Sequence, residues 1–289
     1  MSTASASQDL SEQVPATMEQ WKELETAMYL DNKSLKGCQT LAPRSKVTYE
    51  QFLLFRTVIS KKEPAEFDPA SFGLKEKHDR ATQLLKASDQ FQSYVNAIKM
   101  DTFYAKDAFG LLRHSQREVL GLRKDERAVN MTFISLLQAI SNTYPGCKSW
   151  WRFSRHLLTA TFGHFGGKTR GFTATTKGQL QDKGTDQIVA IVDSTVEAPT
   201  LQVDIYEASQ IVAWVKSYPE PKYQRIVVAQ HDCEFYVTFA EYDDDWLAYL
   251  NRSLLELKSV MSMNRFGPWD LRNWQDVEEV AAIFLAIAI

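Results

Sequence analysis

Residues 171–215 (GFTATTKGQLQDKGTDQIVAIVDSTVEAPTLQVDIYEASQIVAWV) decide the fold of this chain. The segment 172–176 is rich in aromatic and β-branched residues, which favours a strand, and Gly178 interrupts it. The apolar run 188–192 is typical of a strand buried on both faces, and Asp193 follows at its carboxyl end, where open α/β sheets place their chemistry. Apolar residues then recur at helical spacing, at Ile205, Ala208, Ile211, Val212 and Val215. The stretch therefore predicts strand, turn, strand, loop and helix.

Segments of this stretch resemble the PD-(D/E)XK, or restriction-endonuclease-like, nuclease superfamily, and in particular a fungal group of nuclease-like proteins. The family motifs are FxAxTDG in one strand, IxExK at the end of the next strand, and xQExxQxVAW in the following helix. The matching segments here are FTATTKG (172–178), IVDST (191–195) and IYEASQIVAW (205–214). The likeness continues through 235–250 and 263–271 and covers roughly residues 110–289. The resemblance implies an α/β fold with a central mixed sheet flanked by helices.

The family's metal-binding positions are altered in this chain. The family Asp falls on Lys177, the Glu on Asp193, the Lys on Thr195 and the helix Gln on Tyr206. Such nucleases hold Mg²⁺ with hard oxygen ligands, and an ammonium group in place of a carboxylate repels the cation. The resemblance therefore implies a nuclease-like protein with a dismantled metal site and no cofactor. We expect the former active-site cleft to bind nucleic acid or a protein partner without catalysis.

Two other functions remain open from the sequence. One is a nuclease that uses Mg²⁺ or Mn²⁺ with displaced acids, drawn from Asp182, Asp186 and Glu197. In the superfamily the helix before the first core strand often carries a Glu that reaches the metal, and Glu126 is the matching position, although an acid there also suits the first turn of any helix. The other function is small-molecule acid/base chemistry in a repurposed cleft, with the candidate set Lys177, Asp193, Tyr206 and Glu207.

A basic segment, residues 148–170, contains no acidic residue and interleaves cations with aromatic side chains. Such a pattern can follow a phosphate backbone and stack on bases. The candidate nucleic-acid-binding residues are Lys148, Arg152, Arg155, Lys168 and Arg170. The same segment is also compatible with an ordinary helix over 150–161, whose apolar face enters the core and whose cations are solvated.

The rest of the chain is organised around this core. We predict a disordered N-terminus at 1–16, a helical region at 17–120 and the nuclease-like domain at 121–289. Within the helical region, helices are expected at 48–60 and 76–99, the latter broken near Ser88. In the domain, a helix is expected at 125–142. A hairpin is expected from 225–230 and 234–240, and a helix at 246–257, with Asp243, Asp244 and Asp245 either capping that helix or binding a cation.

Composition limits the class of protein further. The net charge of −3 argues weakly against a dedicated nucleic-acid binder, without excluding a local basic surface. The three cysteines show no metal-ligand spacing, and no histidine pair has zinc-site spacing. The start of the chain lacks the features of a secretory signal, and the apolar run 280–289 is too short for a membrane span. We therefore expect a cytoplasmic or nuclear protein with no membrane contact.

Overall fold

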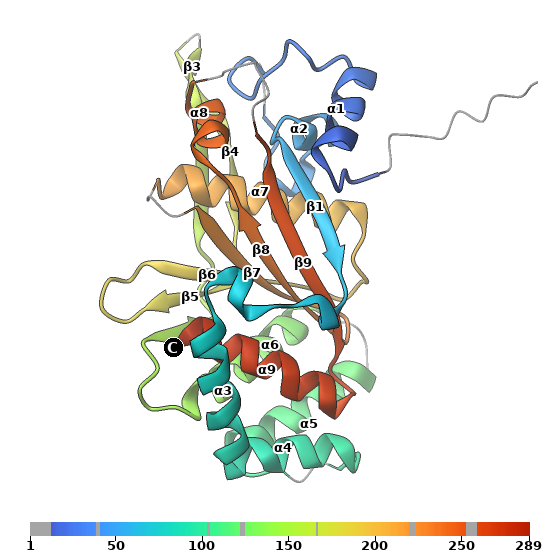
Figure 1. Ribbon diagram of the computed structural model, residues 1–289, viewed down its shortest axis with the longest axis vertical. Coiled ribbons are helices and arrows are strands. Elements are labelled where there is room, and N and C mark those ends of the chain that lie inside the picture. Colours follow the sequence, from blue (N-terminus) through green and yellow to red (C-terminus); the bar gives the residue numbers. More distant parts are fainter. Residues whose placement is uncertain are drawn as a thin grey trace, which may run out of the picture.

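The computed structural model describes residues 13–38, 41–102, 105–121, 125–165, 167–219, 223–252 and 259–289. A seven-stranded mixed sheet forms its centre (Figure 1). The pairs β1–β9 and β6–β7 are parallel, and the other neighbours are antiparallel. In spatial order the strands are β1 (Thr57–Lys62), β9 (Met261–Asp270), β8 (Glu234–Glu241), β7 (Gln224–His231), β6 (Ile188–Thr195), β5 (Gly178–Asp182) and β2 (Ser149–Arg152).

Helices cover both faces of the sheet because its central strands are apolar on both sides. In the β6–β7 register, Val192 and Val228 face one core, while Ile191 and Val227 face the other. The first core is closed by α3 (Lys75–Ala87), α4 (Asp89–Lys99), α5 (Ala108–Gly121), α6 (Glu126–Asn142) and α9 (Trp274–Ala288). The second is closed by α1 (Met18–Ala27), α2 (Tyr49–Leu53), α7 (Leu201–Ser217) and α8 (Asp244–Arg252).

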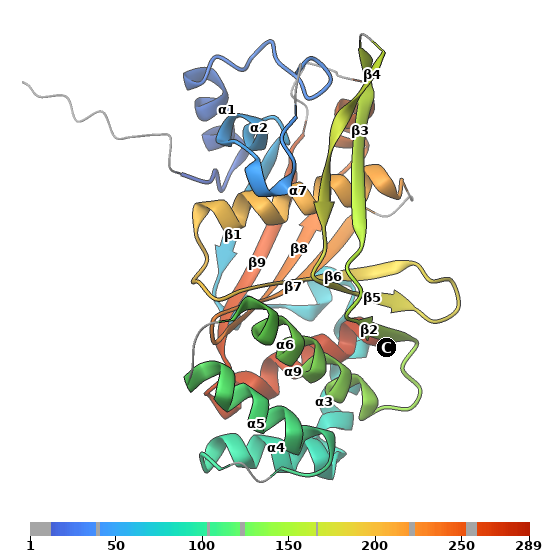
Figure 2. The same cartoon turned by 180° about the vertical axis from the view of Figure 1, so that it is seen from behind.

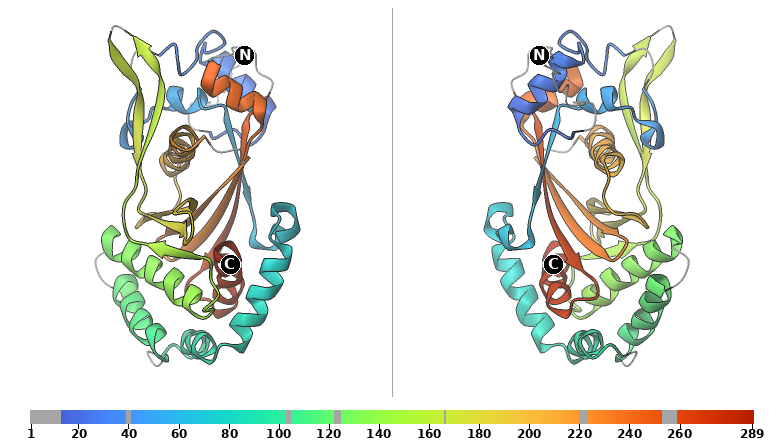
Figure 3. Two further views of the ribbon diagram at one scale, coloured as in Figure 1. Left: turned by 90° about the vertical axis from the view of Figure 1, so that its left-hand side faces the viewer. Right: turned by 90° about the vertical axis from the view of Figure 1, so that its right-hand side faces the viewer.

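A separate two-stranded antiparallel ribbon is formed by β3 (Leu157–Phe165) and β4 (Lys168–Thr175). Helix α7 lies between this ribbon and the central sheet (Figure 3). Side chains on β3 alternate, with Leu158, Ala160 and Phe162 buried against α7 and Leu157 exposed. The period of two residues explains why this segment is extended and why the helix predicted for 150–161 is wrong.

The defining stretch contains a strand, β5, between the two strands that the sequence predicts. The strand predicted at 172–176 lies in the ribbon, and β5, which follows it, pairs with β6 in the central sheet. Gly178 marks the transition between the two, because a Cβ atom there would lie 2.8 Å from the carbonyl oxygen of Arg152 and 2.6 Å from a methyl carbon of Ile134. Only glycine allows β5 to approach β2 and α6 this closely.

The N-terminal region contributes a strand to the sheet as well as helices. The helix predicted for 48–60 ends after Leu53, and Arg56 adopts a positive φ of 50° that turns the chain. The β-branched residues Thr57, Val58 and Ile59 then form β1 at the edge of the sheet. The helix prediction failed here because these apolar residues pack in a sheet rather than on a helix face.

Other predicted elements are confirmed. The helix at 125–142 is α6, with Asp125 as its cap, and the break near Ser88 separates α3 from α4. The predicted hairpin is β7 and β8. Asp243 accepts a hydrogen bond of 2.9 Å from the backbone nitrogen of Trp246, which is the capping role. The predicted disordered terminus lies mostly outside the described residues, as do residues 253–258 at the end of the predicted helix 246–257.

The apolar run 280–289 forms most of α9, which is buried beneath the sheet. This helix packs against α3, α4 and α6 (Figure 2). Among the described residues, no helix has the length and apolar character that a membrane span requires. The run is therefore a central part of the core.

Because Leu285 on α9 is fully buried, Leu285→Ala should lower the free energy of unfolding by about 2–5 kcal/mol. The matched control is Leu111→Ala on α5, where the side chain is 79% exposed, and its effect should stay within about 0.5 kcal/mol. Urea denaturation followed by circular dichroism measures both values. Equal destabilisation by the two variants would contradict the position of α9 in the core.

Candidate functional site

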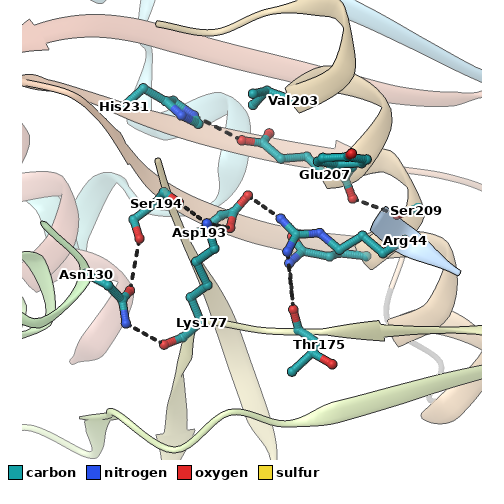
Figure 4. A network of polar contacts seen from close by, with 12 residues as sticks. Arg44, Asn130, Thr175, Lys177, Asp193, Ser194, Val203, Glu207, Ser209 and His231 are labelled. Carbon is teal, nitrogen blue, oxygen red and sulfur yellow. Dashed lines mark hydrogen bonds and ion pairs between the residues drawn. The ribbon is translucent and has the colours of Figure 1, made fainter. Parts of the chain in front are cut away.

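The candidate site lies where β6 ends beside the turn between β4 and β5 (Figure 4). Lys177 occupies that turn, and its backbone nitrogen donates to the carbonyl oxygen of Val192 at 3.1 Å. Helix α6 fixes the turn, since the Asn130 amide donates to the Lys177 carbonyl at 2.9 Å and accepts from the Ser194 hydroxyl at 3.2 Å. These contacts aim the Lys177 ammonium group at the end of β6.

Asp193 is held between two cations. Its Oδ2 lies 2.6 Å from the Arg44 guanidinium and its Oδ1 lies 3.4 Å from Lys177 Nζ, while only 4% of its side chain is exposed. Arg44 comes from a 3₁₀ turn, Arg44–Lys46, in the N-terminal region. The turn is anchored on α7, because the Tyr206 hydroxyl donates to the Ser45 carbonyl at 3.2 Å and the Tyr206 ring lies under the guanidinium.

Glu126 also reaches this cluster, as a partner of Lys177 rather than of a metal. Its Oε1 lies 2.8 Å from Lys177 Nζ, and its side chain is half-exposed at the start of α6. Lys177 also donates to the carbonyl oxygen of Ser194. The ammonium group therefore links Glu126 on the surface to Asp193 in the interior.

A second buried cluster engages Glu207 beside the candidate site. Glu207 Oε2 lies 2.6 Å from Arg265 on β9, and its Oε1 lies 3.4 Å from His231 Nε2 on β7. Arg265 also pairs with Asp204, whose other oxygen lies 3.0 Å from Lys61 Nζ on β1. The cluster joins α7 to three strands of the sheet.

The surrounding cations keep both buried carboxylates charged. Burial alone would raise the pKa of Asp193, but Arg44 and Lys177, followed by His231, hold that pKa below its ordinary value. Burial likewise opposes ionisation of Glu207, whose pKa is held below its ordinary value chiefly by Arg265. Since both pKa values lie below those of ordinary carboxyl groups, both side chains are ionised at neutral pH.

The remaining predicted residues do not converge on Asp193. Thr195 accepts a hydrogen bond from the backbone of Glu197 at 3.3 Å. Asp182 accepts from the backbone of Gly184 and Thr185, and Asp186 lies 3.5 Å from Arg152. The acids suggested as displaced metal ligands thus have local roles, except Glu197, which is exposed.

The basic residues lie in two places along the ribbon. One is its base, where β3 begins at Leu157 and β4 ends at Thr175, and the other lies toward its far end. Lys148 and Arg155 are exposed near its base, and Arg152 stacks on Trp150 with the guanidinium carbon 4.4 Å from the ring centre. Arg170 lies roughly 20 Å along the ribbon and donates to the Lys36 carbonyl at 2.8 Å. The side chain of Lys168 lies outside the described residues. The cluster at the base is therefore smaller than the sequence predicted.

The site does not fit the divalent metal that active nucleases of the resembled superfamily bind. The ammonium and guanidinium groups occupy the immediate surroundings of the Asp193 carboxylate, where a metal would need further oxygen ligands. Over the part of the chain that the structure describes, no group of three or more His, Cys, Asp or Glu side chains is arranged to hold a metal ion. No metal-dependent step follows from this geometry.

No protein-family model matches this chain, and no curated protein matches it. The class that the structure defines is an α/β protein with a seven-stranded mixed sheet flanked by helices. The site adds a buried carboxylate clamped by cations from two distant segments.

Asp193→Asn should lower the free energy of unfolding by about 3 kcal/mol at pH 7, because it leaves two cations without their shared buried partner. The depressed pKa means that the carboxylate stabilises the protein fully above its unfolded pKa of about 3.9 and loses this effect as the pH falls through the lower folded value. The gap between wild type and variant should therefore narrow below about pH 4.

Urea denaturation between neutral and acidic pH measures this gap. Asp79→Asn on exposed α3 is the matched control and should change the free energy of unfolding by less than about 0.5 kcal/mol at each pH. A gap for Asp193→Asn that stays constant across the acid range would contradict the ion-pair role.

Proposed function

We propose that this protein is a nuclease-like protein that no longer cleaves, and that it binds nucleic acid through the cations and aromatic side chains at the base of the ribbon. The loss of cleavage is supported by the two ion pairs that Asp193 makes with Arg44 and Lys177. Lys177 stands where the resembled family has its metal-binding Asp, and Arg44 closes the other side of the carboxylate.

Electrostatics explains why these two ion pairs oppose catalysis. A divalent cation approaching Asp193 would face two positive charges and would have to displace the 2.6 Å contact with Arg44 in a buried environment. Repulsion between like charges is strongest where water is excluded. Losing metal affinity removes both the activated water and the charge stabilisation that phosphodiester cleavage needs.

Nucleic-acid binding is proposed from a local surface on which exposed aromatic and cationic side chains occur together. Trp150 is 48% exposed, Phe153 44% and Leu157 61%, and Lys148, Arg152 and Arg155 accompany them. Exposed aromatic rings beside Lys and Arg suit phosphates and bases. Glu207, by contrast, is engaged by Arg265, which gives the small-molecule acid/base alternative no support.

Isothermal titration of Mg²⁺ and of Mn²⁺ into the protein tests whether the site around Asp193 still binds a divalent metal. Because the two cations neutralise Asp193, we expect no saturable binding and no difference between wild type and Asp193→Ala. Saturable binding that disappears in Asp193→Ala, together with cleavage of a labelled DNA or RNA, would favour the nuclease alternative.

Fluorescence anisotropy with a labelled oligonucleotide tests the binding surface. The double variant Arg152→Gln/Arg155→Gln should weaken binding about tenfold. It should also reduce the salt dependence of binding, because a protein that neutralises fewer phosphates releases fewer counterions when it binds. The control Lys75→Gln/Lys86→Gln removes the same charge from exposed positions on α3 and should leave binding unchanged. Absence of binding to every DNA and RNA probe at low salt would turn the search to protein partners.

A further inference from the structure

A cavity of about 430 Å³ lies beside β2 at the C-terminal end of α6. It is distinct from the site around Asp193, because Asn130 faces that site while Asn142, at this end, lies about 18 Å further along the helix. Figure 2 shows β2 beside α6 and below the base of the ribbon. The residues that matter for binding are Gln138, Ser141, Asn142, Ser149, Trp150 and Lys183.

Trp150, whose side chain is exposed, borders this cavity on the edge strand β2. Trp150 and Arg152 share the outer face of β2 because strand side chains alternate, and Trp151 points inward. The Trp151 indole donates to the Ser141 hydroxyl at 3.1 Å, and its carbonyl accepts from the Gln138 amide at 2.8 Å. These bonds hold β2 on α6, so the Trp150 ring is presented to solvent by a rigid support.

The polar groups around the cavity match a base edge and a phosphate. Lys183 Nζ donates to the Cys147 carbonyl at 2.6 Å, and an ammonium group has two further donors. Gln138 uses its amide nitrogen on β2, which leaves its oxygen as an acceptor, and the Asn142 side chain is exposed. Exposed Lys148 lies next to this rim in the chain.

We propose that this cavity is a base-binding subsite for single-stranded nucleic acid, a proposal that rests on the nucleic-acid binding inferred above. An unstacked base lies against the Trp150 ring, which it shares with Arg152, and reaches the amides of α6 around the free edge of β2. The backbone passes Lys183, Lys148 and Arg155. Phe153, also exposed, offers a second ring for a neighbouring base. The volume suits about one nucleotide, and stacking on a ring requires a base that is not paired within a duplex.

The selectivity for single strands follows from the geometry of the rings. Phosphate contacts alone would bind the duplex at least as tightly as the single strand, because the duplex carries more backbone charge per unit length. An exposed indole adjoining a cavity adds stacking that only a splayed base can use. The subsite therefore predicts that single strands bind more tightly than duplexes, a preference that the cations alone do not predict.

The test compares a labelled single strand of about 20 nucleotides, as DNA and as RNA, with a duplex of the same length by fluorescence anisotropy at about 100 mM NaCl. We expect the single strand to bind at least tenfold more tightly than the duplex. Trp150→Leu should weaken single-strand binding about tenfold with little effect on the duplex, while Trp150→Phe, which keeps a ring, should retain most of the affinity. Circular dichroism checks that the variants are folded.

Asn142→Asp provides an independent variant, since it adds a negative charge at an exposed helix end and should also weaken single-strand binding. If no probe binds the wild-type protein, the proposed function itself fails. If probes bind but the duplex binds as tightly as the single strand, or if Trp150→Leu and Asn142→Asp both bind like wild type, the subsite is overturned while the nucleic-acid-binding proposal stands.

Discussion

The buried ion pair between Arg44 and Asp193 is the contact on which the candidate site depends. A carboxylate with 4% of its side chain exposed remains ionised only because two cations meet it. The same contact ties a turn in the N-terminal region to the end of a central strand, across a sequence separation of 149 residues. One interaction therefore sets both the charge of the candidate site and the position of the N-terminal turn that packs against it.

The second cluster extends this principle across the sheet. Arg265, Glu207 and Asp204 are buried together, and Lys61 completes the charge balance from the edge strand. Each carboxylate on α7 has a cation on a strand beneath it, so the rotation of the helix on the sheet is fixed by charge as well as by packing. Desolvation offsets much of the attraction within buried pairs of this kind, so they contribute less to stability than their short distances alone would indicate.

Much of the fold could be predicted from local pattern, and less of the site. The apolar run before Asp193 and the helical spacing after Ile205 correspond to β6 and α7, because each pattern matches the period of its element. The segment 150–161 was ambiguous, since its burial is decided by packing on α7. Arg44 could not be foreseen, because nothing local to its turn indicates a partner so distant in the chain. The ion pair of Glu207 with Arg265 could not be foreseen for the same reason.

The position of β1 has a consequence for how the molecule is made. Thr57 pairs with Met261, so strands roughly 200 residues apart lie side by side, and β9 separates β1 from every other strand of the sheet. During synthesis the edge strand has no neighbour until β9 has left the ribosome. Contacts this distant in sequence slow folding and expose apolar edges to other chains. The emerging polypeptide therefore carries the β-branched residues of β1 unpaired for a long interval, and during that time the strand can pair with other chains.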